Sequence, residues 1–146
     1  MIPVFGVAAV AGESGNGNIY YAERLKELHG VRVPMLWLHQ GTPMKRTDTI
    51  PADKIIGYCT VYWNGQGLLY IGEVKNEFKW CVEQAKGASI GAFNHSFFPP
   101  HVVGEMTLVE VSLVTNPSIK DAEYLVTNDY VTYIKVAHAF GHKKTS

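Results

Sequence analysis

The chain has 146 residues, 47% apolar and 18% charged, a composition that predicts one globular domain over residues 1–146 and excludes a disordered chain. Its 13 basic and 13 acidic side chains cancel, which argues against a nucleic-acid partner. No apolar run approaches the roughly 20 residues of a membrane span, and the N-terminus lacks the positive region of a signal peptide. Cys59 and Cys81 are the only cysteines, so we expect them to be reduced, in a reducing compartment.

Short runs rich in Val, Ile, Tyr, Phe and Trp dominate the sequence, and turn residues separate most of them, which is typical of β-strands. The predicted strands cover residues 2–10, 31–38, 54–63, 67–74, 89–94, 106–115, 123–127 and 130–138. Apolar residues at helical spacing, followed by glycine, predict helices over 19–29 and 76–86. A flexible loop is expected at 12–18 and a frayed tail at 143–146. These elements favour a mostly β fold, a closed or nearly closed barrel with flanking helices.

One hairpin has a clear local signal. Residues 64–67, Asn-Gly-Gln-Gly, separate the β-rich run 58–63 from the run 68–71. An Asn-Gly pair between two such runs indicates a tight turn of the primed type. The strands 54–63 and 67–74 are therefore predicted to be joined as a β-hairpin.

Ser89 is the first candidate for chemistry, because residues 87–91 match the pattern G-x-S-x-G. In α/β-hydrolases this pattern joins a strand to a helix, but here a predicted helix precedes it and an apolar run follows, so that fold is excluded. Small neighbours still suit a nucleophile, since they admit a substrate and leave N–H groups near Ile90 and Gly91 free for an oxyanion. The alternative is an ordinary serine in a glycine-rich turn.

A serine nucleophile needs a base, and His39 is the most unusual of the six histidines. It ends the apolar run 33–38, a strand expected to be largely buried, where an imidazole is held rigidly with one edge open to a cleft. The alternative is a hydrogen-bonded histidine at a strand end. His138 and His142 are spaced four residues apart, but Gly141 interrupts any helix there and no further ligand follows, so no metal site is predicted.

Glu110 is the third candidate, within the apolar segment 106–114. Strand alternation places Leu108, Glu110, Ser112 and Val114 on one face and Val109, Val111 and Leu113 on the other. Because both faces are mostly apolar, we expect a central strand with Glu110 at least partly buried. A buried carboxylate needs a partner, such as a histidine that becomes imidazolium during a reaction. The alternative is a glutamate on a half-exposed face or bonded to a backbone amide.

Taken together, these segments resemble, in order, those of the tailed-phage prohead proteases, capsid-maturation serine proteases related in fold to the herpesvirus assembly protease. The resemblance runs from about residue 5 to residue 122. The matching segments are 5–7 with the helix after the Gly/Asn loop, 33–39, 56–57 with 67–72, 87–93, and 109–117 with Ala122. The last of these is similar to the family pattern E-[IV]-S-[LV]-V-T-x-P.

The resemblance implies Ser89 as nucleophile, His39 as general base and Glu110 as orienting acid, with no cofactor and no metal. In the herpesvirus relatives the third member is a histidine, so His95 and His101 are alternatives to Glu110. It also implies an endopeptidase that cleaves scaffold and major capsid protein, and itself, inside the assembling prohead in the host cytoplasm. Self-association is left open, and neither nucleic acid nor membrane is an expected partner.

The sequence is compatible with two alternative functions. Gln40 stands where the family's usual segment carries an acidic residue, which suits an inactive, protease-like structural protein of the capsid. The 8 Tyr, 6 Phe and 3 Trp residues suit a small ligand-binding β-barrel. The separation of His39 from Ser89 distinguishes the barrel from the protease, because a serine nucleophile and its base must lie within hydrogen-bond reach.

Overall fold

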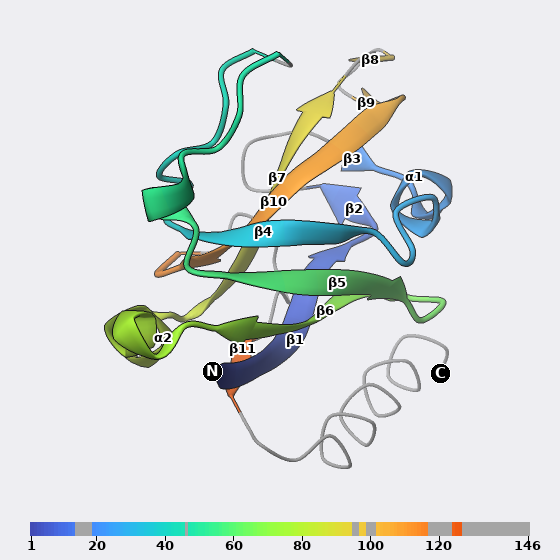
Figure 1. Ribbon diagram of the computed structural model, residues 1–146. Helices are drawn as coiled ribbons and strands as arrows, with labels where there is room; N and C mark the ends of the chain where they lie inside the picture. Colours follow the sequence, from blue (N-terminus) through green and yellow to red (C-terminus); the bar gives the residue numbers. More distant parts are fainter. Residues whose placement is uncertain (14–18, 46, 95–96, 99–101, 117–123, 127–146) are drawn as a thin grey trace.

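A computed structural model describes residues 1–13, 19–45, 47–94, 97–98, 102–116 and 124–126 (Figure 1). The longer strands are β1 (Ile2–Val10), β4 (Arg32–Trp37), β5 (Gly57–Trp63), β6 (Gly67–Val74), β7 (Gly87–Asn94), β10 (Met106–Val114) and β11 (Tyr124–Val126). The shortest strands are β2 (Gly12–Glu13), β3 (Ile19–Tyr20), β8 (Phe97–Phe98) and β9 (Val102–Val103). The helices are α1 (Ala22–Lys26) and α2 (Lys79–Gln84), with 3-10 turns η1 (Ala52–Lys54) and η2 (Asn76–Phe78).

The longer strands form one seven-stranded sheet in the order β11–β1–β6–β5–β4–β10–β7. This sheet is a curled half-barrel, so the predicted closure is wrong, whereas the mostly β character with few helices is confirmed. The reason lies at β1, whose outer edge is taken by β11, so that β7 contacts β1 without pairing with it. Figure 1 shows β7 and β10 crossing steeply behind β4 and β5.

The β2, β3, β9 and β8 strands form a separate small sheet that the sequence did not predict. Each has only two residues, too few for an alternation pattern to be visible. The stretch 12–18, expected to be a loop, begins with β2, and its residues 14–18 lie outside the described residues. The predicted strand 130–138 and the tail 143–146 also lie outside them.

Both predicted helices are shorter than expected. In 19–29 the first two residues form β3, α1 follows, and turns lead to Gly30, whose φ of +84° ends the segment. In 76–86 the first turn is η2, and the chain is already extended at Ala85. The expected strand 54–63 begins late, because η1 precedes it and β5 starts at Gly57.

The predicted hairpin is present, but its turn differs from the expected one. β5 and β6 pair without interruption from Gly57–Val74 to Trp63–Leu68. Gly65 has a φ of +95°, whereas Asn64 does not have the positive φ that a type I′ turn requires. Instead, Asn64 Oδ1 accepts hydrogen bonds from the N–H groups of Gln66 (2.9 Å) and Gly67 (2.8 Å). The asparagine side chain therefore closes a longer loop.

The core lies on the inner face of the large sheet and includes residues of both helices. Leu25 and Leu28 from the α1 segment and Val82 from α2 pack against the strand residues there. Cys59 and Cys81 are buried in this core as free thiols. Within the described part of the chain, no helix is long and apolar enough to cross a membrane.

Candidate active site

The candidate site is built where β10 lies between β4 and β7. β10 pairs in parallel with β4 and antiparallel with β7, and Ser112 lies opposite Ser89. Directly paired residues of a sheet project to the same face, so both hydroxyl side chains lie on one face. Ser89 therefore belongs to the middle of a strand, and its interpretation as a residue of a glycine-rich turn is wrong. His39 follows the end of β4 closely and reaches the same place.

The structure brings Ser89, His39 and Glu110 together in one hydrogen-bonded cluster. The Nε2 atom of His39 lies 3.0 Å from Ser89 Oγ, and its Nδ1 atom lies 2.6 Å from Glu110 Oε1. An ionised carboxylate can only accept hydrogen bonds, so Nδ1 carries the ring proton of neutral His39. This leaves Nε2 to accept the hydrogen bond that Ser89 donates. The ligand-binding barrel requires His39 and Ser89 to lie far apart, which this distance contradicts.

Glu110 is completely buried, so its half-exposed alternative is wrong. The carboxylate accepts a second hydrogen bond from Ser112 Oγ at 2.6 Å, so both of its oxygens have a donor. Ser89 is 7% exposed, whereas the His39 side chain is 38% exposed. The site thus has a buried acid and an imidazole with one edge open to solvent.

The electrostatic effect of this arrangement falls on His39. The hydrogen bond to Glu110, together with the negative charge of that carboxylate, raises the pKa of His39, and partial burial opposes this only in part. The imidazole is therefore a stronger base than a free histidine, and its protonated form is stabilised by the buried carboxylate.

A β-bulge in β10 turns Glu110 toward the site. The pairing with β7 shifts between Leu108 and Glu110, so Val109 is the extra residue. Leu108 consequently packs in the core with Val111 and Leu113, while Val109 lines the outer surface. The predicted faces of Leu108 and Val109 are therefore wrong, because simple alternation does not account for the inserted residue.

Gly91 makes room for the carboxylate of Glu110. A Cβ atom at Gly91 would collide with Glu110 Oε1 and would lie 2.7 Å from Glu110 Cδ. The missing side chain therefore serves Glu110, whereas the sequence suggested that small residues here admit a substrate. The N–H groups near Ile90 and Gly91 were expected to bind an oxyanion. The pairing of β7 with β10 reduces these two donors to one, because the N–H groups of adjacent strand residues point in opposite directions. Only one of Ile90 and Gly91 can direct its N–H away from β10.

The backbone turns sharply at His39. Leu38 and His39 have φ values of +52° and +59°, in the left-handed region that costs about 1–2 kcal/mol for a residue with a side chain. Hydrogen bonds hold this turn: Leu38 N–H donates to the Leu113 carbonyl at 3.0 Å, and Thr42 Oγ1 donates to the His39 carbonyl at 2.9 Å. The N–H of His39 donates to Ser112 Oγ at 3.0 Å. Leu does not signal such a turn in the sequence, and His, although enriched among residues with positive φ, is uncommon there.

The remaining sequence candidates are not brought into the cluster. His95 and His101, the alternatives to Glu110, lie outside the described residues, as do His138 and His142. Gln40 is exposed, and its N–H donates to the Trp37 carbonyl at 2.9 Å. No group of three or more His, Cys, Asp or Glu side chains in the described ranges could hold a metal ion. The sequence did not predict that Ser112 and Gly91 hold Glu110 in place. The available signal was the position of Ser112, two residues from Glu110 on the same predicted face.

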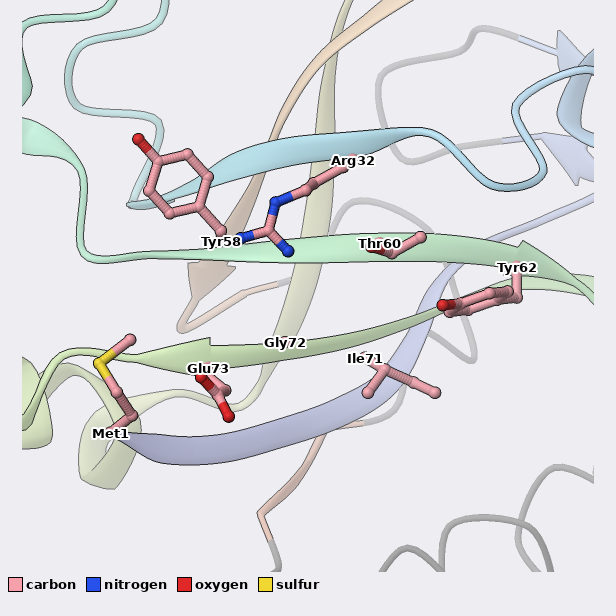
Figure 2. A pocket seen from close by; sticks show the side chains of 8 residues that line it. All are labelled: Met1, Arg32, Tyr58, Thr60, Tyr62, Ile71, Gly72 and Glu73. Carbon is pink, nitrogen blue, oxygen red and sulfur yellow. The ribbon is translucent and has the colours of Figure 1, made fainter.

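Two open grooves lie on the outer surface of the sheet. One, of about 340 Å³, follows β4, β5 and β6, where Arg32 lies 5.3 Å from the centre of the Tyr58 ring (Figure 2). The other, of about 550 Å³, is lined by the segment 48–50, by Phe93 of β7 and by Val109 of β10. Phe93 is four residues from Ser89 on the same strand, so both side chains project to the same face. The second groove therefore lies on the same face of the sheet as the Ser89–His39–Glu110 cluster.

Comparisons with known proteins support the fold. No protein-family model matches the sequence, and no curated protein matches it. Kaposi's sarcoma herpesvirus protease with a hexapeptide phosphonate inhibitor superimposes with a TM-score of 0.63 at 12% identity, over 99% of this chain and 77% of that chain. The same protease with an allosteric inhibitor gives a TM-score of 0.63 at 11% identity, over 100% and 92% of the two chains. The herpesvirus-protease-like fold is thereby confirmed, while identity at this level carries no further assignment.

Proposed function

We propose that this protein is a serine endopeptidase with Ser89 as nucleophile, His39 as general base and Glu110 as the acid that orients His39. The observation that carries the proposal is the continuous hydrogen-bond chain from Ser89 Oγ through both nitrogens of His39 to Glu110. Nucleophile, base and orienting group within hydrogen-bond reach of one another are what acyl transfer by serine requires. The same chain argues against an inactive structural protein, which has no need of it.

In the proposed reaction, Ser89 Oγ attacks the carbonyl carbon of a peptide bond while its proton passes to His39 Nε2. The tetrahedral intermediate then breaks its C–N bond, and the imidazolium returns the proton to the leaving amine. The acyl group remains on Ser89 as an ester. Water, deprotonated by the same nitrogen, attacks the ester, and the proton goes back to Ser89 as the acid product leaves. Glu110 stabilises the imidazolium at both stages, and the N–H of Ile90 or Gly91 is the candidate donor to the oxyanion.

A polypeptide substrate suits the surroundings of the cluster. The groove with Phe93 and Val109 offers an open, partly apolar surface on the same face of the sheet as Ser89, where side chains of an extended chain can be placed. The similar herpesvirus protease binds a hexapeptide phosphonate, which supports peptide recognition on this fold. The resemblance of the sequence to prohead proteases extends the proposal to scaffold and major capsid protein as substrates, to self-cleavage, and to action inside the assembling prohead.

Labelling with a fluorophosphonate tests the chemistry. The probe should modify wild-type protein at Ser89, because His39 activates that hydroxyl. Ser89→Ala should abolish labelling while changing the free energy of unfolding by less than about 1 kcal/mol, since one hydroxyl is removed. His39→Gln should nearly abolish labelling, and His29→Gln, a change at an exposed histidine outside the cluster, should preserve it. Labelling of the Ser89→Ala protein as strong as that of wild type would contradict the proposal.

Co-expression with scaffold and major capsid protein tests the substrate. Both should be shortened in the presence of wild-type protein and remain intact with Ser89→Ala, as seen on a gel of assembled proheads. If wild-type protein labels at Ser89 but leaves both proteins intact, the proposal of a peptidase stands. The proposal that scaffold and major capsid protein are its substrates is then refuted. Absence of both labelling and processing would favour the inactive structural protein.

A further inference from the structure

Ser112 is linked to two members of the Ser89–His39–Glu110 cluster without belonging to it. Its Oγ atom lies 3.0 Å from the backbone nitrogen of His39 and 2.6 Å from Glu110 Oε2. Ser112 is completely buried, so these protein groups, not bulk solvent, surround its hydroxyl. The side chain thus lies between the backbone that carries the imidazole and the carboxylate that binds the imidazole.

The direction of these hydrogen bonds follows from the groups involved. A backbone N–H can only donate, so Ser112 Oγ accepts from His39. A carboxylate can only accept, so the single proton of the hydroxyl is donated to Glu110 Oε2. The other carboxylate oxygen, Oε1, accepts from His39 Nδ1. A closed ring of three hydrogen bonds results, in which both the backbone and the side chain of His39 are tied to one carboxylate.

This ring of hydrogen bonds holds His39 and Glu110 in positions that the local backbone alone does not fix. His39 has a left-handed φ of +59°, a conformation that a histidine does not favour and that its neighbours must hold in place. On the side that faces Gly91, no side chain of that residue packs against the Glu110 carboxylate. Without the hydroxyl, the His39 N–H and Glu110 Oε2 would both lose their hydrogen bonds in a buried place.

We propose that Ser112 is a positioning residue, which fixes the imidazole of His39 between Glu110 and Ser89 by bonding the His39 backbone and the Glu110 carboxylate at once. This inference rests on the proposed peptidase function for its kinetic consequence. Its structural content, the ordering of the His39–Glu110 hydrogen bond by Ser112, is independent of that function. The two can therefore be tested separately.

Comparing four residues at position 112 distinguishes the effect of the hydroxyl group from the effect of side-chain packing. Ser and Thr provide Oγ, whereas Ala and Val do not; Ala is close to Ser in size, and Val is close to Thr. We expect Ser112→Ala and Ser112→Val to lower kcat for peptide cleavage by about 10- to 100-fold with little change in KM, as loss of an orienting partner does. Ser112→Thr should restore most of kcat relative to Ser112→Val. Thr60→Ala, which removes a hydroxyl from the outer face of β5, should match wild type.

A spectroscopic measurement detects the positioning itself. The Nδ1 proton of His39, in a hydrogen bond of 2.6 Å to Glu110, should give a proton NMR resonance at unusually low field. We expect Ser112→Ala and Ser112→Val to shift this resonance to higher field or broaden it, Ser112→Thr to retain it, and Glu110→Gln to abolish it. Circular dichroism identifies the variants that fold, and the resonance is compared among those.

The outcomes distinguish the two proposals. Wild-type kcat and an unchanged resonance in a folded Ser112→Ala protein would overturn the role of Ser112 and leave the peptidase standing. A kcat that follows side-chain size, equal in Ser and Ala and lower in Thr and Val, would also overturn it. If wild-type protein neither cleaves peptides nor labels at Ser89, the proposed function fails. Loss of the low-field resonance in Ser112→Ala would then still support the positioning role.

Discussion

The β5–β6 hairpin and the β7–β10 pair are both antiparallel, but their registers are set in different ways. The hairpin pairs without a shift from its turn to Gly57, and Asn64 holds the turn from within. The β7–β10 pair is interrupted at Val109, and its strands are not joined by a tight turn. Both pairs contribute core residues, but the irregular pair also holds the buried Glu110. Regular pairing thus builds the sheet, whereas the bulge at Val109 orients the polar side chains of the cluster.

Replacing Glu110 should have the largest effect on the irregular side of this comparison. Glu110→Gln keeps the shape but removes the charge, so we expect cleavage to fall by up to about 10⁴-fold while remaining measurable. Because Glu110 raises the pKa of His39, its loss lowers that pKa. The acidic limb of the pH profile of kcat/KM should therefore move to lower pH. Glu77→Gln, at an exposed position on η2, is the control. An unmoved limb would transfer the third role to His95 or His101.

Two glycine substitutions sharpen the comparison, one on each side of it. Gly91→Ala should displace the Glu110 side chain, so we expect cleavage to drop at least 10-fold, with about 1–3 kcal/mol lost from the free energy of unfolding. In Gly72→Ala the new Cβ would lie 2.5 Å from the Tyr58 carbonyl oxygen, a backbone atom that cannot move aside. We expect at least as large a loss of stability there, with wild-type cleavage per folded molecule. Equal cleavage by both variants would contradict the assigned role of Gly91.

A smaller effect is expected at the hairpin turn. Asn64→Ala removes the acceptor of two backbone N–H groups, so the free energy of unfolding should fall by about 1 kcal/mol. Cleavage at temperatures where the protein stays folded should be unchanged, because the turn belongs to the regular pair. Urea denaturation and a peptide assay check the two halves of this expectation. A loss of cleavage in folded Asn64→Ala would show that the hairpin and the cluster are coupled.

The smallest expected effect is on the pH dependence of stability. The pKa of His39 is higher in the folded protein than its usual value of 6.5. Protonated His39 therefore stabilises the fold at pH values below 6.5, and this contribution is lost as the pH rises through the raised pKa. The stability of wild type minus that of His39→Gln, measured by urea denaturation, should be larger at pH 6 than at pH 9. A difference that stays constant or grows with pH would contradict the His39–Glu110 pairing.

Much of the regular structure could be predicted from sequence because its causes are local. The bounds 2–10 and 67–74 agree with β1 and β6, since runs rich in apolar residues between turn residues define those strands. The small sheet could not be predicted, because two-residue strands carry no pattern, and neither could the edge that β11 takes on β1. The helices were predicted too long, because the spacing of apolar residues does not show where the helix ends and a neighbouring strand begins.

The members of the candidate site were predicted from sequence, but not the means by which they meet. Ser89, His39 and Glu110 were selected by residue type, strand context and resemblance to a family, all of which are visible in the sequence. The left-handed turn at Leu38 and His39, the bulge at Val109 and the space above Gly91 depend on contacts between distant strands. Residues without a distinctive chemical type at such points, Ser112 among them, therefore escaped assignment.

The parallel pairing of β4 with β10 has a consequence for the timing of activity during synthesis. Glu110 and Ser112 are separated from His39 by 71 and 73 residues, so no part of the N-terminal half contains the carboxylate that His39 needs. In the described sheet β7 is joined only to β10, so Ser89 has no strand partner until residues 106–114 have left the ribosome. A growing chain therefore holds base and nucleophile without the frame that brings them together. For the proposed peptidase, this order of assembly withholds the candidate site until residues 106–114 have been made.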